Sequence, residues 1–177
     1  MENSFKSSAA NYGLILGVIL SLLTVFAYVF MLELYTKWWL MIILLVLIVA
    51  IGIAAAVKSR KILGGYINFK NAFTAYFIAI LVGTLISTLT NIVIFNFVDP
   101  GAAETLKEMT MDATQQSMES WNVPQEEIEK GMEKMAQTDN FAIGTQLKNT
   151  AYGLVFQCVI GLIVALVVRK KDPNAVA

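Results

Sequence analysis

The sequence contains no histidine and only one cysteine, Cys158, among 177 residues. These two scarcities exclude a disulfide within the chain, a thiolate zinc site and a histidine proton relay. Charge is scarce as well: charged residues fill 15% of the positions and hydrophobic residues 57%, against about 25% and 45–50% in a typical soluble domain. This balance indicates that lipid is the solvent for most of the chain.

Charged residues are missing altogether from four long stretches, residues 7–32, 38–57, 71–98 and 149–168. A helix rises about 1.5 Å per residue, so about 20 apolar residues cross a hydrocarbon layer of roughly 30 Å. We therefore predict an all-α polytopic membrane protein, a single membrane domain over residues 1–177 with a bundle of four transmembrane helices. The expected spans are residues 12–32, 38–57, 72–96 and 149–168.

The first stretch is expected to be a retained span and not a cleaved secretory leader. Its apolar run is long, and no small-residue cleavage pattern follows it.

The charges that the chain does have are sorted by sign. Ten of the thirteen acids lie between Asp99 and Asp139, whereas the connection before the third span and the tail are basic. Cations near span ends stay on the cytoplasmic side, so both termini are expected in the cytoplasm and the acidic segment, residues 99–140, outside. The topology-determining residues are Lys58, Arg60, Lys61, Lys70, Arg169, Lys170 and Lys171.

Small residues predict where the spans pack, because helices in lipid associate through close backbone approach and a few hydrogen bonds. They recur at helical spacing in the first and last spans, and the predicted packing positions are Gly13, Gly17, Ser21, Gly153 and Gly161. The third span instead presents a polar stripe, which consists of Thr84, Ser87, Thr88 and Asn91. We interpret this stripe as packing, with a polar path for a solute as the alternative.

Gln157 is, with Asn91, the most polar side chain deep in the apolar windows. An unpartnered amide in hydrocarbon costs on the order of one to several kcal/mol, so Gln157 should face inward. We expect it to form a hydrogen bond with the polar stripe of the third span. No charged residue lies at membrane depth, whereas carriers and proton-coupled proteins usually place one there.

The acidic segment carries two helical patterns, residues 102–120 and 124–137. Asp99-Pro100-Gly101 separates them from the third span, because proline cannot continue a helix. The segment is rich in methionine, but its methionines occupy apolar helical positions, so we do not expect a copper site. No EF-hand spacing, phosphate-binding loop or nucleophile motif occurs, and we expect no cofactor, no metal and no nucleic-acid partner.

Several short motifs together resemble a known family. They are Gly64-Gly65-Tyr66-Ile67-Asn68-Phe69-Lys70-Asn71-Ala72-Phe73, Asp99-Pro100 after a polar-flecked third span, Pro-x-Glu-Glu-Ile at residues 124–128, and the closing Arg169-Lys170-Lys171. The chain resembles, over nearly its whole length, the four-span bacterial membrane proteins grouped as domain of unknown function family 4199. The resemblance implies a bacterial inner-membrane protein of this topology and carries over no activity, substrate or catalytic residue.

Three hypotheses about function follow, in order of preference. The first is a non-enzymatic structural or interaction protein whose acidic segment contacts another protein or a second copy. The second is a small transporter or channel that uses the polar stripe. The third is a membrane-embedded enzyme, for which only cysteine, tyrosine or serine chemistry would be available. Membrane lipid is an expected partner in every case, through the basic residues.

Overall fold

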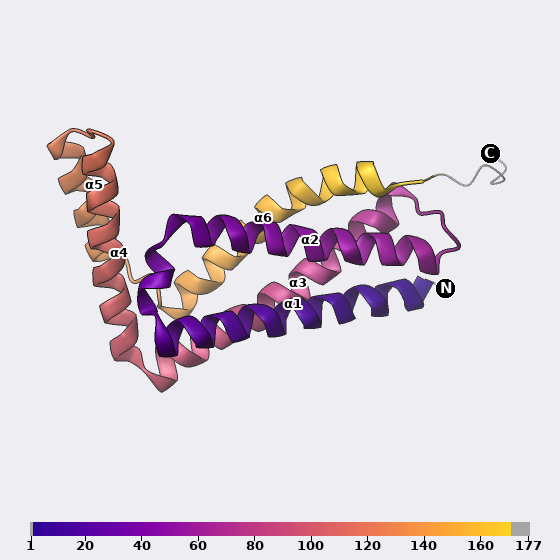
Figure 1. The fold of residues 1–177 in the computed structure, drawn as a ribbon, viewed down its shortest axis with the longest axis horizontal. Helices are drawn as coiled ribbons and strands as arrows, with labels where there is room; N and C mark the ends of the chain where they lie inside the picture. The colour runs from indigo at the N-terminus through magenta and orange to yellow at the C-terminus, as the bar shows by residue number, and fades with distance from the viewer. Residues whose placement is uncertain (1, 171–177) are drawn as a thin grey trace.

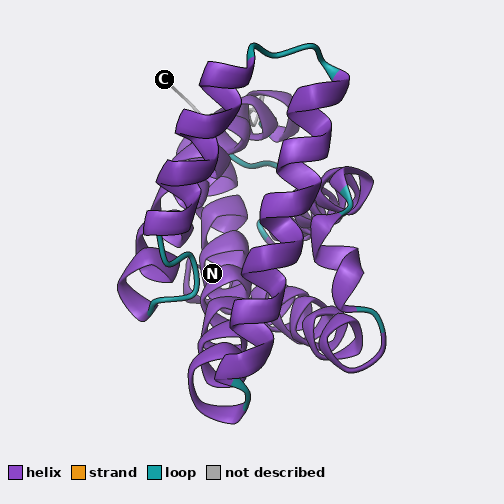
Figure 2. Ribbon diagram, turned by 90° about the vertical axis from the view of Figure 1, so that its left-hand side faces the viewer, coloured by secondary structure: helices purple, strands orange, loops and turns teal. Residues whose placement is uncertain are grey.

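The computed structural model describes residues 2–170, and helices make up their regular structure apart from one isolated bridge between Ile67 and Lys170 (Figure 2). In chain order the elements are α1 (Glu2–Phe30), the 3-10 helix η1 (Leu32–Thr36), α2 (Trp38–Ile62), α3 (Phe69–Val93), the π-helix η2 (Ile94–Val98), α4 (Pro100–Ser120), α5 (Gln125–Gln137) and α6 (Ile143–Val168).

Four of these helices are long and apolar enough to cross a membrane: α1, α2, α3 with its continuation η2, and α6. The shortest of them has 25 residues, which exceeds the roughly 20 that a bilayer requires. The predicted fold class is confirmed as an all-α bundle with four helices able to span a membrane. The positions at which lipid begins and ends along each helix stay a prediction.

The four long helices lie along one axis, and α3 is the central one because it packs against α1, α2 and α6 (Figure 1). Tyr76 and Ile80 of α3 meet Leu16, Ala56 and Ala165 from the other three helices in one buried cluster. Large apolar side chains instead cover the outer surface of the bundle, among them Val46, Leu89 and Val167. Such a surface suits lipid and not water.

The remaining two helices, α4 and α5, form a pair that lies across one end of the bundle (Figure 1). We call residues 100–137, which comprise α4, α5 and the turn between them, the helical arm. The sequence predicted helices over residues 102–120 and 124–137, and these match α4 and α5 closely. The amino-terminal end of α1 and the connection between α2 and α3 lie at the opposite end of the bundle.

A short irregular joint connects the bundle to the helical arm. The Asp99 N–H donates to the Ile94 carbonyl at 2.8 Å, and this bond closes the π-helical turn of η2. The Asp99 carboxylate then caps α4 by accepting from the Ala102 N–H at 3.0 Å, and it accepts from the Tyr28 hydroxyl at 3.0 Å. One residue thus joins α1 and α4 through its side chain and η2 through its backbone N–H, which fixes where the arm begins.

Candidate functional site

The most deeply buried polar contact joins α3 to α6. The Tyr76 hydroxyl donates to Oε1 of Gln157 at 2.7 Å, and both residues are buried. Gln157 lies 11 residues before Val168, or about 16 Å along α6 from its basic end. Gln157 therefore faces inward as expected, but its partner is Tyr76 and not the polar stripe, because the stripe lies closer to the helical arm.

The sequence pattern did not identify Tyr76 as the partner of Gln157. The signal was present, because a tyrosine in a charge-free window needs an acceptor for its hydroxyl. Glycines from two neighbouring helices make room for its ring. A Cβ at Gly52 of α2 would lie 2.5 Å from a ring carbon of Tyr76, and one at Gly161 of α6 would lie 2.8 Å away.

The predicted packing glycines of α1 have a similar role against α3. A Cβ at Gly13 would lie 2.7 Å from the Ala79 carbonyl oxygen, and one at Gly17 would lie 2.7 Å from the Cβ of Ile86. One turn further on, the Ser21 hydroxyl forms a 2.8 Å hydrogen bond with the Thr90 hydroxyl. These contacts bring the backbones of α1 and α3 together along most of their length.

Gly153 does not take part in this packing, which corrects the prediction for that residue. It is exposed, and a Cβ built on it would meet nothing within 4 Å. Gly153 and Gly161 are two steps of four residues apart, and each step advances about 40° beyond a full turn. The two glycines therefore point about 80° apart, and only Gly161 faces α3.

The residues of the polar stripe bond partly to each other and partly to α6. The Thr88 hydroxyl lies 2.9 Å from the Thr150 hydroxyl, and Nδ2 of Asn91 donates to the Ser87 carbonyl at 2.9 Å. Thr84 and Ser87 are half-buried on the same helix. At the arm's end of the stripe lies a polar niche of about 200 Å³, lined by Thr88, Asn91, Asn140, Phe141, Gln146, Asn149 and Thr150.

The cations predicted to determine topology gather at the end of the bundle that lies away from the arm. Arg60 donates from Nη1 to the Val168 carbonyl at 3.3 Å, and the Lys170 ammonium lies 5.5 Å from the centre of the Tyr66 ring. Backbone hydrogen bonds of 3.0 and 2.9 Å pair Ile67 with Lys170. Lys58, Lys61, Lys70 and Arg169 are exposed around them, and Lys171 lies outside the described residues.

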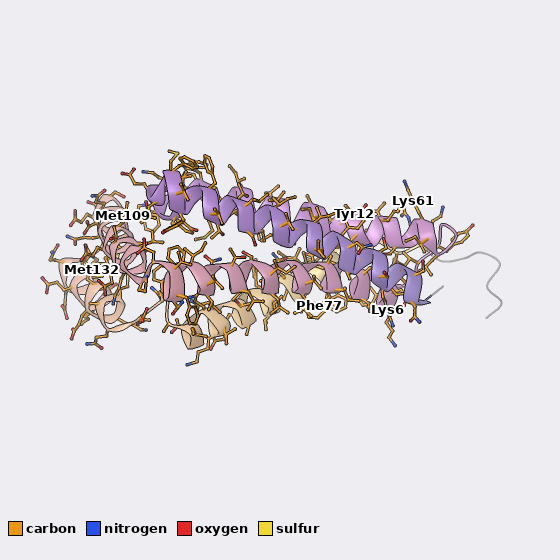
Figure 3. All side chains as sticks on the ribbon, turned by 90° about the horizontal axis from the view of Figure 1, so that it is seen from below. Lys6, Tyr12, Lys61, Phe77, Met109 and Met132 are labelled. Atoms are coloured by element: carbon orange, nitrogen blue, oxygen red, sulfur yellow. The ribbon has the colours of Figure 1, made fainter. Side chains whose placement is uncertain are left out.

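Figure 3 shows the resulting separation along the molecule, with Lys6 and Lys61 at one end and Met109 and Met132 of the helical arm at the other. The two ends also differ in charge, because the arm carries eight acids and three lysines. No group of three or more candidate metal-ligating acids and thiols occurs within the described residues.

Comparison with known proteins places the chain in a family. The model of the family described as "Protein of unknown function (DUF4199)" matches residues 11–170. No curated protein and no solved structure matches the chain. The chain belongs to the DUF4199 family.

Proposed function

We propose that this member of the DUF4199 family is a non-enzymatic integral protein of the bacterial inner membrane whose helical arm binds another protein or a second copy of the chain. In this proposal both termini lie in the cytoplasm, and the arm lies on the other side of the membrane. The observation that carries the proposal is an exposed tryptophan at the tip of an acidic helix pair that is held firmly on the bundle.

The arm is attached firmly enough to present a defined surface. Leu106 and Ala103 of α4 pack against Phe95 and Ile94 of η2, and all four are buried. The Phe95 ring also contacts Phe141, with ring centres 5.0 Å apart. An arm held in this way loses little further conformational freedom on binding, which favours affinity.

Within the arm, α5 rests on α4 through few contacts. Ile128 is its one buried residue, and the Lys107 ammonium of α4 donates to the Ala136 carbonyl at the last turn of α5 at 2.6 Å. A cation at that position is favourable because the carbonyl end of a helix carries partial negative charge. Most of the α5 surface is left available for a partner.

The exposed surface of the arm favours a basic partner. All eight of its acids are exposed: Glu104, Glu108, Asp112, Glu119, Glu126, Glu127, Glu129 and Glu133. Trp121, at the turn between α4 and α5, is 78% exposed. Tryptophan is enriched at the energetic centres of protein interfaces, and surrounding charges steer the approach of an oppositely charged partner.

The experiment that tests the proposal compares two tryptophans of similar exposure, Trp121 at the tip of the arm and Trp38 at the start of α2, which is 75% exposed. Each is replaced in turn by a photo-crosslinking amino acid in intact cells. We expect a discrete protein adduct from position 121, weakened in Glu126→Lys, and no protein adduct from position 38. Protein adducts at neither position, or equal adducts at both, would contradict the proposal.

Solute transport along the polar stripe is the second candidate function, and the polar niche between α3 and α6 is the observation that favours it. The Tyr76–Gln157 pair lies further from the arm than the niche and is buried between α3 and α6. A solute would therefore require these helices to separate. Flux of a small polar solute into proteoliposomes, lost in Thr88→Leu or Asn91→Leu, would establish this function in place of the first.

A further inference from the structure

We propose that the space between the helical arm and the bundle binds a membrane lipid with an uncharged, hydroxyl-bearing head, of the acylglycerol or glycolipid class. Its chain would lie in an apolar hollow beneath the arm and its head in the polar niche. This site is separate from the exposed tip of the arm, so it does not depend on the protein partner proposed above.

The apolar hollow has a volume of about 440 Å³ and lies between the arm and the end of the bundle. Its apolar lining consists of Tyr35, Met41, Leu106, Met111, Met135 and Phe141. Three of these six side chains are methionines from three different helices, and unbranched thioether chains adapt well to a flexible apolar ligand. Burial raises the pKa of the Tyr35 hydroxyl, which donates to the Thr24 carbonyl at 3.2 Å.

The hollow opens toward lipid. Met41 lies in the first turn of α2, three residues after Trp38, and is 74% exposed on the apolar outer surface of the bundle. An acyl chain from the leaflet on the arm's side therefore reaches the hollow past Met41 without crossing a polar surface. A lipid is the occupant that this position favours.

The polar niche adjoins the hollow, because Asn140, Phe141 and Asn149 line both. A molecule that passes over Phe141 would place its apolar part in the hollow and its polar part in the niche. The two volumes together suit an amphiphile and not a purely polar solute.

Hydrogen bonding within the niche specifies the kind of head group. Nδ2 of Asn91 is engaged with the Ser87 carbonyl, and Nε2 of Gln146 donates to the Phe141 carbonyl at 2.6 Å. Each of these amide nitrogens keeps one further N–H, and the amide oxygens can accept, so the niche offers both donors and acceptors. A hydroxyl group both donates and accepts and can therefore pair with either kind of partner, whereas a phosphate diester only accepts.

The charges around the site also favour an uncharged, hydroxyl-bearing head group. The lining of the niche contains amides, hydroxyls and one phenyl ring but no charged side chain. Lys107 is the one charged residue that lines the hollow, and its ammonium donates one of its three N–H groups to the Ala136 carbonyl. Its charge thus lies at the last turn of α5 and not in the lining of the niche, where the head would lie. The exposed acids of the arm would repel an anionic head, so an uncharged head is preferred.

The test uses the full chain in nanodiscs of zwitterionic phospholipid and two photoactivatable probes with the same chain, a monoacylglycerol and a lysophosphatidylglycerol. We expect the monoacylglycerol to label residues around Met41, Met111 and Met135 about tenfold more strongly than its phosphate-headed counterpart. A tenfold preference corresponds to about 1.4 kcal/mol, the scale of one well-formed hydrogen bond. Equal labelling by both probes, or labelling spread evenly over the bundle surface, would overturn the proposal.

Two pairs of variants make the test specific. Met111→Trp fills the hollow and should reduce labelling by the monoacylglycerol about tenfold, whereas Met31→Trp, at an exposed methionine outside the hollow, should not. Asn91→Leu removes an acceptor from the niche and should abolish the preference between the probes, whereas Gln116→Leu on the exposed face of α4 should keep it.

Asn149→Leu repeats the niche test at an exposed position, in case Asn91→Leu disturbs folding. Unchanged labelling in Met111→Trp together with an unchanged preference in Asn149→Leu would contradict the site. A photo-crosslinking amino acid at position 111 that captures protein instead of lipid would assign the hollow to a protein partner and would also overturn the lipid proposal.

Discussion

At the residue scale, the hydrogen bond between Tyr76 and Gln157 is the clearest case of a polar contact that holds spans together. The sequence indicated that Gln157 faces inward and bonds to the third span, since an unpartnered amide in hydrocarbon is costly. It could not identify the partner, because that choice depends on how far α3 and α6 are shifted along each other. Glycines at positions 52 and 161 set this shift by admitting the Tyr76 ring.

The first prediction concerns this pair. Tyr76→Phe and Gln157→Leu should each lower the free energy of unfolding in detergent, Tyr76→Phe by about 1–3 kcal/mol because it leaves a buried amide without its partner. In a double-mutant cycle the two changes should couple by about 0.6–2 kcal/mol. Tyr152→Phe, at an exposed position on α6, is the control. A coupling energy near zero would show that the two side chains do not interact.

At the element scale, the pattern of small residues predicted the α1–α3 contact well and the α6 contact only in part. Gly13 and Gly17 lie one step of four apart and both face α3, since a single step rotates a helix position by only about 40°. The strip in α6 also runs over two steps, but its first member, Gly153, is exposed and has no neighbour within 4 Å of a built Cβ. The buried face of α6 instead follows Gln157, Gly161, Val164 and Val168, a mixture of steps of three and four.

The second prediction follows from this difference between two glycines of one helix. Gly161→Ala should lower the free energy of unfolding by about 1–3 kcal/mol, because its Cβ would overlap the Tyr76 ring. Gly153→Ala should leave stability unchanged or raise it by up to about 1 kcal/mol through better helix propensity. Thermal unfolding in detergent measures both. Equal destabilisation by the two substitutions would place Gly153 in a packed interface.

The joint between α3 and α4 shows another limit of the sequence. Asp99-Pro100 correctly indicated a break and a new helix, but nothing in Ile94–Val98 signals a π-helical turn. The π-helical turn depends on contacts between distant parts of the chain, because it occurs where Phe95 is buried against Tyr28, Tyr35 and Phe141. The direction of the arm across the bundle depends on these aromatic contacts, which come from four separate parts of the chain.

The third prediction tests the cap of α4. Asp99→Ala removes the acceptor for the Ala102 N–H and should destabilise the start of the arm by about 0.5–2 kcal/mol. Hydrogen exchange over residues 100–106 should then become faster, while exchange in α6 stays unchanged. Asp99→Asn keeps a capping oxygen and should retain most of the protection. Exchange rates in Asp99→Ala that match the unmodified protein would show that the cap does not secure the arm.

At the scale of the whole molecule, composition alone was enough for the fold class, because four uncharged windows of sufficient length leave few other arrangements. The charges that remain are unevenly distributed, because cations gather around Arg60 and Lys170, whereas acids outnumber lysines eight to three in the arm. The hollow beneath the arm was not predictable. Its lining combines residues from α2, α4, α5, α6 and the connections, and these meet only after the arm has folded back across the bundle.

The proposed topology is tested most directly by measuring on which side of the membrane each end of the bundle lies. Cys158→Ala gives a background without thiols, into which single cysteines are introduced as Lys61→Cys and Glu127→Cys. A membrane-impermeant maleimide applied to cells whose inner membrane is intact and accessible should label position 127, and it should label position 61 only after the membrane is permeabilised. Labelling of both positions, or of neither, before permeabilisation would contradict a four-span protein with its basic end in the cytoplasm and its helical arm outside.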